Sequence, residues 1–428
     1  MSAVRAEESA EPGELEDLES FRLRAREFLK ANFRPATMDE MRWDFHASEE
    51  EELAEIAHER GLQRALFDAG LAGICFPREY GGQGLTPAHQ EVLNEELIGY
   101  EYPRRTQIPT FSPCATVLLE FGTEEQKLRH LPAILRGDEL WMQFLSEPSG
   151  GSDVAGALTT AVRDGDQWVL NGSKIWTTGA WWSDWGLCLA RTNWDVPKHR
   201  GLSVFVFPIH QPAIEVHRIE MLNGSREFCQ EFLTDVIVPD TDRVGDVDDG
   251  WTVGIRWMFH ERMLYTSPYV THPIGSTPSR MFSGAVYNVA HEAGRLDDPS
   301  VRDMVGEARM LELVSEEMSG RVAERMTRGQ LSDQAAALVR LGKAQAQTRI
   351  CTLALEVAEA SGAAWAEDTA AANSAVNFLM RQGGSIGGGT VEMARNVVAE
   401  RVLSMPRERA MDRDIPFRDV PRSRPAQS

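Results

Sequence analysis

The hydrophobic periodicity of this 428-residue chain changes twice, which narrows the folds that it can adopt. From about Glu14 to Gly137, apolar residues recur every three or four positions, as in amphipathic helices. Between about Trp141 and Pro239 they form short, β-rich runs separated by turn residues, which indicates a compact antiparallel barrel or sandwich. A helical pattern then returns after Gly250 and continues to about Leu403. We therefore predict an α+β protein in which a β domain follows one helical domain and precedes another.

These changes of period suggest four segments. We expect an N-terminal α-helical domain over residues 1–140, a central β domain over 141–242 and a C-terminal bundle of antiparallel helices over 243–406. Residues 407–428 are polar and rich in Arg and Pro, so we expect an extended arm or a frayed tail. Within the β domain, the pair Asn171-Gly172 lies between two apolar runs and predicts the type I′ turn of a β-hairpin.

Charge and composition exclude several classes of function. The chain has 44 Lys and Arg against 65 Asp and Glu, and the net charge of -21 disfavours binding to nucleic acid or to anionic membrane surfaces. The acidic segment from Met1 to Leu18 does not resemble a signal peptide, and we find no apolar stretch long enough for a membrane span. The five cysteines are widely spaced, as expected for reduced thiols. We expect a cytoplasmic protein with neither a nucleic-acid nor a membrane partner.

The sequence contains no motif for a metal site or for a common nucleotide-binding loop. Its ten histidines form no H-E-x-x-H arrangement, and neither G-x-G-x-x-G nor G-x-x-x-x-G-K occurs. We predict no metal, and any nucleotide cofactor must be held in another way.

Two clusters in the β region are candidates for ligand binding. The segment 144–156 is rich in Gly and Ser, which leave backbone N–H groups and small hydroxyls available to a polar or planar ligand. An ordinary helix-to-sheet connection is the alternative for this segment. The segment 176–182 places a pair of Thr hydroxyls between indole rings, an arrangement that suits a flat heteroaromatic ring. The alternative there is a Trp cluster that closes one end of a barrel.

A third cluster, Gly383 to Thr390, has five glycines in seven residues before a helical run. We expect Thr390 to cap that helix and the glycines to let a ligand approach backbone N–H groups. A plain linker is the weaker explanation, because so many glycines cost conformational entropy on folding.

The fourth candidate is Glu261, in a segment that we predict to be helical. The residues three and four positions away are Trp257, Met258, Leu264 and Tyr265, and none of them can neutralise a carboxylate. A carboxylate on an apolar face has a raised pKa and can serve as a base. The alternative is an ion pair with an Arg from another helix.

Together these segments resemble the acyl-CoA dehydrogenase family of flavoenzymes, from about Phe21 to Pro406. The resemblance rests on four stretches that occur in the family order, namely Tyr80-Gly81-Gly82-Gln83-Gly84-Leu85, Ser146-Glu147-Pro148 to Gly156, Asn171-Gly172-Ser173-Lys174-Ile175-Trp176-Thr177-Thr178 and Gly387-Gly388-Gly389-Thr390. It implies that an acyl-CoA thioester lies between FAD and a carboxylate. The carboxylate removes the α-proton while the β-hydride passes to the flavin, which yields a trans-2-enoyl-CoA.

The resemblance also assigns roles by motif position. Residues implied to contact FAD are Leu145, Ser146, Trp176, Thr178, Thr390 and Glu392, and residues implied to hold the CoA portion are Ser152 and Arg262. An electron-transfer flavoprotein is the implied electron acceptor, and β-oxidation of fatty acids or other lipids is the implied context.

Two departures from the family pattern are informative. Many members place the base just before the Gly-Thr pair, but that position is Gly388 here, and Gly388 can contribute only its backbone N–H to the thioester carbonyl. The isovaleryl and long-chain branches instead carry a Glu before an Arg on the earlier helix, as Glu261-Arg262 does. We therefore assign Glu261 as the base.

The second departure lies at Gly294 to Asp298, where typical members carry an Arg-x-Thr-Phe-Gly stretch that reaches the FAD pyrophosphate of a neighbouring subunit. Two aspartates stand here instead, and their charge is wrong for a phosphate contact. A homotetramer would lack this contact, whereas some actinobacterial relatives pair with a second, complementary subunit. A homo-oligomer and a hetero-oligomer both remain open.

Two rival functions also remain open from the sequence. One is a flavin acyl-CoA oxidase of the same fold, and the other is a non-catalytic subunit of a hetero-oligomeric dehydrogenase. The position of the base, together with the actinobacterial resemblance, favours branched, long or ring-bearing acyl groups such as sterol fragments.

Overall fold

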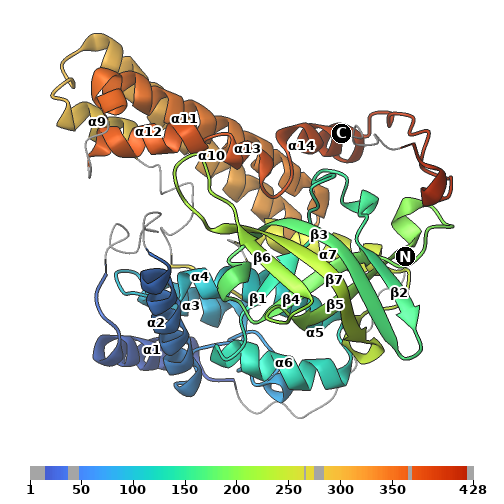
Figure 1. Cartoon of the computed structure of the whole chain (residues 1–428). Coiled ribbons are helices and arrows are strands. Elements are labelled where there is room, and N and C mark those ends of the chain that lie inside the picture. The colour runs from blue at the N-terminus through green and yellow to red at the C-terminus, as the bar shows by residue number, and fades with distance from the viewer. Residues whose placement is uncertain (1–14, 37–47, 265–266, 274–283, 365–368, 422–428) are drawn as a thin grey trace.

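The computed structural model describes residues 15–36, 48–264, 267–273, 284–364 and 369–421. Figure 1 shows the N-terminal helices and the sheet side by side, while the long C-terminal helices extend away from both. Within the described residues, no helix combines the length and the apolar character that a membrane crossing needs.

The N-terminal region consists of short helices. They are α1 (Leu18–Asn32), α2 (Glu49–Asp68), α3 (Pro87–Glu96), α4 (Arg104–Pro109), α5 (Thr116–Phe121) and α6 (Glu124–Arg136). A capping box between Ser48 and Glu51 starts α2, as its sequence dictates. The buried face of α2 carries Ile56 and Leu66, but also Glu52, Glu59 and Gln63. One of these polar residues, Glu59, lines the cavity of the candidate active site.

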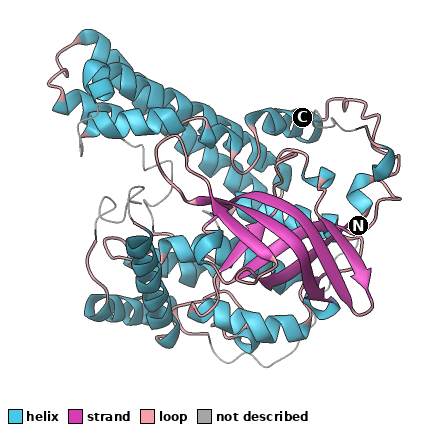
Figure 2. Ribbon diagram, viewed as in Figure 1, coloured by secondary structure: helices cyan, strands magenta, loops and turns pink. Residues whose placement is uncertain are grey.

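The central region is an eight-stranded, mainly antiparallel sheet that curves strongly (Figure 2). Its strands are β1 (Trp141–Phe144), β2 (Thr160–Asp164), β3 (Gln167–Thr178), β4 (Trp185–Arg191), β5 (Leu202–Pro208), β6 (Ile214–Arg218), β7 (Phe228–Pro239) and β8 (Arg243–Val244). The order is β6-β7-β3-β2-β4-β5-β8, and β1 pairs in parallel with β4. The buried cluster that includes Trp141, Leu187 and Trp257 joins the sheet to the helices.

The prediction of a hairpin turn at Asn171-Gly172 is wrong. Both residues lie inside the continuous strand β3, at a register shift against β7, and the hairpin turn is instead at Gly165, between β2 and β3. A Cβ on Gly172 would lie 2.5 Å from Oγ1 of Thr159, so Gly172 permits a close approach of two chain segments. Asn171 bonds to Asp235 across the bulge. The Asn-Gly pair thus shapes a bulge, which has the same local sequence preferences as a turn.

The C-terminal region is helical, as predicted. It comprises α7 (Gly250–Arg262), α9 (Ala285–Glu292), α10 (Pro299–Thr327), α11 (Ala336–Ala364), α12 (Ala370–Met380), α13 (Gly383–Ile386) and α14 (Val391–Val397), followed by a π-helical turn, η9 (Val398–Val402). Helices α9 to α12 share a core of Val, Leu, Ile and Ala side chains. This order of elements confirms the predicted fold class.

The described part of the C-terminal arm packs against the β domain. Phe417 stacks on Trp194 with ring centroids 5.4 Å apart, and the guanidinium of Arg191 lies 3.9 Å from the centroid of the Phe417 ring. The backbone N–H of Phe417 also donates to the carbonyl of Val196. The arm therefore anchors the β4–β5 connection.

Candidate active site

A cavity of about 540 Å³ lies between the N-terminal helices, strands β1 and β3, and helix α7. This volume lies within the range of small-molecule sites in proteins. Thr178, at the end of β3, and Glu261, in the last turn of α7, both line it. Two residues that are far apart in the sequence, and that we singled out for different reasons, therefore face the same space.

Glu261 is partly buried and makes no hydrogen bond or ion pair within the described part of the chain. Burial raises the pKa of its carboxyl, and the charges of Arg262 and Arg340 offset this only in part. The alternative was an ion pair between Glu261 and an Arg from another helix, and the described residues show no such pair. Arg340 of α11 instead donates to the carbonyls of Gly384 and Gly387, at 2.8 and 2.6 Å. Glu261 is thus a carboxylate disposed to accept a proton.

The last turn of α7 is fixed by polar contacts on the faces that do not carry Glu261. The indole N–H of Trp257 donates to Oε1 of Gln143 at 2.7 Å, and Trp257 is fully buried. The imidazole Nε2 of His260 lies 2.8 Å from Oε1 of Glu120, and Ser112 donates to the carbonyl of His260. These contacts hold the helix end that presents Glu261.

The glycine cluster lies directly beside Glu261. A Cβ on Gly388 would be 4.0 Å from Oε1 of Glu261, and a Cβ on Gly389 would be 3.8 Å from Nη2 of Arg262. Both glycines have positive φ angles, of 69° and 102°, which are unfavourable for other residues. Thr390 caps α14 by accepting a bond from the N–H of Met393, as predicted. The cluster therefore packs beside Glu261 and Arg262 rather than acting as a free linker.

A buried ion pair anchors the loop after β1. Nζ of Lys174 lies 2.8 Å from Oε1 of Glu147 and also donates to the carbonyl of Leu145. Burial opposes the ionisation of Glu147, but Lys174 and the backbone N–H groups of Leu158 and Thr159 outweigh it and lower the pKa of the carboxyl. The backbone N–H of Ile175 donates to the carbonyl of Ser146. Leu145 and Ser146 are thereby attached to the strand that carries Trp176 and Thr178.

The exposure and the backbone conformation of Trp176 are those expected of a residue that stacks on a bound ligand. Its φ angle is +67°, a strained value for a bulky residue, and 51% of it is exposed although it belongs to a central strand. Its ring meets Phe228 edge to face at 5.9 Å, so the two faces of the indole are not stacked on Phe228. A flat flavin ring against this indole would bury the exposed surface. The observed conformation therefore fits the FAD contact that we predicted.

The two hydroxyls of the Thr pair face in different directions. Oγ1 of Thr177 donates to Oε2 of Glu231 at 2.9 Å inside the sheet, whereas Thr178 lines the cavity. Burial raises the pKa of Glu231 to about 8, with the bond from Thr177 opposing the shift. Of the two threonines, Thr178 is the one that lines the cavity.

The remaining predicted contacts lie outside the cavity. Ser152 is exposed in the loop before a short 3-10 helix, Glu392 is exposed and pairs with Arg395 at 3.5 Å, and Arg262 is exposed beside Gly389. Their assignments to FAD and CoA stay predictions.

The departure at Gly294 to Asp298 has a local explanation. Asp298 caps α10 by accepting a bond from the N–H of Ser300, and it pairs with Arg295 at 3.0 Å. Arg295 also pairs with Glu359. Arg295 and Asp298 are therefore engaged within the chain itself.

Several residues of the site escaped the sequence analysis. Gln143 and Arg340 position Glu261 and the glycine cluster, while Glu59 and Arg105 line the cavity from the N-terminal helices. The one signal for these residues in the sequence was the series of polar residues on the buried face of α2, which interrupts the apolar periodicity at Glu59.

Three models of acyl-CoA dehydrogenase domains match the chain in the order of its architecture. The N-terminal domain matches residues 15–138, the middle domain residues 143–236 and the C-terminal domain residues 284–403. This chain belongs to the acyl-CoA dehydrogenase family, whose members are FAD-dependent flavoproteins of lipid or fatty-acid degradation.

Similar proteins include two acyl-CoA dehydrogenases of Mycobacterium tuberculosis. IpdE1 is 32% identical over 82% of this chain and 88% of its own length. FadE34 is 33% identical over 83% of this chain, but the chain spans only 48% of the length of FadE34. Among solved structures, the Tcur3481-Tcur3483 steroid ACAD has a TM-score of 0.70 and 26% identity, and the match covers 91% of this chain and 98% of that one.

Proposed function

We propose that this chain catalyses FAD-dependent α,β-dehydrogenation of an acyl-CoA thioester to a trans-2-enoyl-CoA, with Glu261 as the base. The observation that carries the proposal is that Glu261 and Thr178 line one cavity of about 540 Å³. A base for the α-proton and a residue for the flavin edge are thereby available to the same substrate, as the reaction requires.

The residues of the chain divide the chemistry between them. Bound FAD supplies the acceptor for the β-hydride. Burial of Glu261 raises its pKa and so strengthens it as a base for the α-proton. The backbone N–H of Gly388, next to Glu261, is the donor that we assign to the thioester carbonyl, where it stabilises negative charge as the proton leaves. Trp176 and Thr178 would hold and orient the flavin, and Leu145 and Ser146 would lie at its edge.

We further propose a ring-bearing or otherwise bulky acyl group, an electron-transfer flavoprotein as acceptor and a hetero-oligomeric assembly. The support is the likeness to the solved structure of the Tcur3481-Tcur3483 steroid ACAD, whose name pairs two proteins. The intrachain pairing of Arg295 with Asp298 and Glu359 supports the same assembly, because it leaves this segment unsuited to a phosphate contact.

The proposed function is tested with a Glu261→Gln variant that is purified with FAD. We expect bound flavin to be retained, but its anaerobic bleaching by acyl-CoA to slow by at least about 1,000-fold, since the amide cannot accept the proton. Glu317→Gln is the matched control, because Glu317 is an exposed residue of α10 paired with Arg321. Full turnover by Glu261→Gln would overturn the mechanism, and rapid oxygen consumption without an electron-transfer flavoprotein would indicate an oxidase.

A further inference from the structure

The side of the cavity formed by α2 and α4 is unusually rich in ionisable groups for a site that receives an acyl chain. The charged or titratable residues that α2, α4 and the neighbouring connections place on this side are Arg34, Glu55, His58, Glu59, Glu101, Arg104 and Arg105. Glu59 and Arg105 are buried, with 6% and 8% of their surface exposed. A simple alkyl chain would cover these groups without offering any hydrogen bond in return, which is unfavourable.

Most of these charges are already paired. Arg105 pairs with Glu55 at 3.0 Å, and Glu101 lies 2.9 Å from His58 and 3.5 Å from Arg34. The pairing leaves little net positive charge to attract an anionic ligand. It favours a neutral polar ligand on this side of the cavity.

Glu59 has a carboxyl oxygen to spare. Its Oε2 accepts bonds from the backbone N–H groups of Arg105 and Thr106, at 2.8 and 2.9 Å, and from Oγ1 of Thr106, at 3.1 Å. Within the described part of the chain, Oε1 receives no hydrogen bond, and Glu59 lines the cavity. Burial raises the pKa of the carboxyl to about 7, so both its neutral and its ionised forms are accessible. Such a group can donate to a keto oxygen or accept from a hydroxyl.

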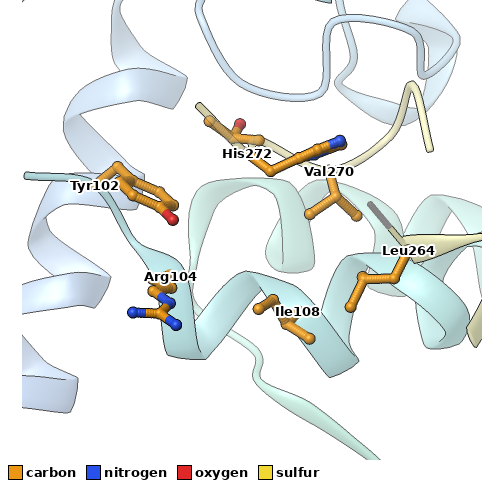
Figure 3. Close-up of a pocket in the computed structure, with 7 residues that line it drawn as sticks. Tyr102, Arg104, Ile108, Leu264, Val270 and His272 are labelled. Atoms are coloured by element: carbon orange, nitrogen blue, oxygen red, sulfur yellow. The ribbon is translucent and has the colours of Figure 1, made fainter. Parts of the chain in front are cut away.

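Apolar side chains line the same cavity beside Glu59. Leu62, Tyr102, Ile108 and Leu264 line the same cavity, and the last three also line a small adjoining recess. Figure 3 shows Tyr102 and Arg104 on one side of this recess and Leu264 on the other, with Ile108 between them. The cavity thus combines an apolar body with a polar point.

We propose that the acyl group of the substrate carries a hydroxyl or keto oxygen remote from the thioester, and that the carboxyl of Glu59 hydrogen-bonds it. This inference rests on the proposed function, because it names the substrate class of that same site. A carboxylate beside Glu59 would meet the like charge of that carboxyl, while Arg34 and Arg105 are already paired with Glu101 and Glu55, so a neutral oxygen is the better match.

The test measures binding rather than turnover. Straight-chain CoA thioesters of increasing length, each with an ω-methyl, ω-hydroxy, ω-keto or ω-carboxy end, are titrated calorimetrically into the FAD-loaded Glu261→Gln chain. At the best chain length we expect the hydroxy or keto ester to bind about 10- to 100-fold more tightly than the methyl ester, as for a buried hydrogen bond. Equal binding of the methyl ester, or tightest binding of the carboxy ester, would overturn the inference.

Variants at Glu59 identify the group responsible. Adding Glu59→Leu should reduce the preference to about one, whereas Glu59→Gln, which can still accept the bonds from α4, should keep it. Thr106→Val is the control, since it removes one bond to Oε2 without touching Oε1. An unchanged preference in a folded Glu59→Leu variant would exclude Glu59, and if that variant does not fold, the ratio with Glu59 intact still decides the substrate class. If the chain with Glu261 intact binds the oxygenated esters but its flavin is never bleached by them, only the proposed function is contradicted.

Discussion

Gly388 lies against Glu261, so that a Cβ added to Gly388 would be 4.0 Å from the Oε1 atom of the carboxylate. The two residues come from different parts of the C-terminal region, one from the glycine cluster before α14 and the other from the last turn of α7. Many relatives carry their base at the position of Gly388, whereas this chain carries a carboxylate at Glu261. Side chains at these two positions would thus reach the same part of the site. This proximity supports our proposal that Glu261 serves as the base in place of a residue at position 388.

The first prediction uses this proximity. Glu261→Gly should abolish turnover, and adding Gly388→Glu should restore a part of it, on the order of 1 to 10%, because a side chain from Gly388 points at the same volume. Full recovery is not expected, since the φ of 69° at Gly388 disfavours a side chain by about 1 kcal/mol or more. Steady-state rates of the two variants provide the measurement. A double variant no faster than Glu261→Gly would show that the two positions do not serve the same reaction centre.

The second prediction concerns the pH dependence of kcat/KM. Glu261 must be ionised to accept a proton, so the rate should fall as the pH decreases through its pKa. Burial raises this pKa above the ordinary value of 4.5, and the midpoint of the acidic limb should therefore lie above pH 4.5. An acidic midpoint at or below pH 4.5, in a protein that is still folded there, would contradict the assignment.

The third prediction concerns the buried Lys174–Glu147 pair, in which Lys174 is fully buried. Lys174→Met leaves the Glu147 carboxylate without its main partner and should cost about 3–5 kcal/mol of unfolding free energy. The double variant Lys174→Met/Glu147→Gln should recover a substantial part of this loss, because no uncompensated charge remains. Denaturant unfolding of the three proteins measures both effects. Equal stabilities of the single and double variants would mean that the pair is not coupled.

The fourth prediction concerns Glu231, whose pKa is raised by burial to about 8. A folded-state pKa above the unfolded value stabilises the fold at low pH, and this stabilisation is lost as the pH rises from about 4.5 to about 8. Glu231→Gln should remove this dependence, while its amide oxygen can still accept from Thr177. Relative to the unmodified chain, the variant should therefore gain thermal stability as the pH increases from 5 to 8.5. A difference in Tm that is constant over this range would show that Glu231 does not titrate as expected.

The sequence predicted the order of helical and β regions because periodicity is a local property of the chain. It was wrong at Asn171-Gly172, since the same two residues suit either a turn or a bulge. The contact of β3 with Thr159 and Asp235 decided between the two. Local preference without the neighbouring strand could not resolve that choice.

The candidate site was predictable in part. Glu261 was visible because its helical neighbours could not neutralise it, and Thr390 because capping depends on residues close in sequence. Gln143, Arg340 and Glu59 were not visible, because each acts on a partner that only folding brings near. The roles of the individual FAD and CoA contacts stay predictions.

The sequence by itself determined the family, the fold class and the use of FAD, because these depend on motifs and periods written along the chain. Tertiary structure alone decided that Glu261 and Thr178 share a cavity, that Gly388 lies beside Glu261 and that Glu59 offers an oxygen on the α2–α4 side. The physical reason is that burial and hydrogen-bond partners, which set the pKa of a carboxyl and the polarity of a cavity wall, come from residues remote in sequence.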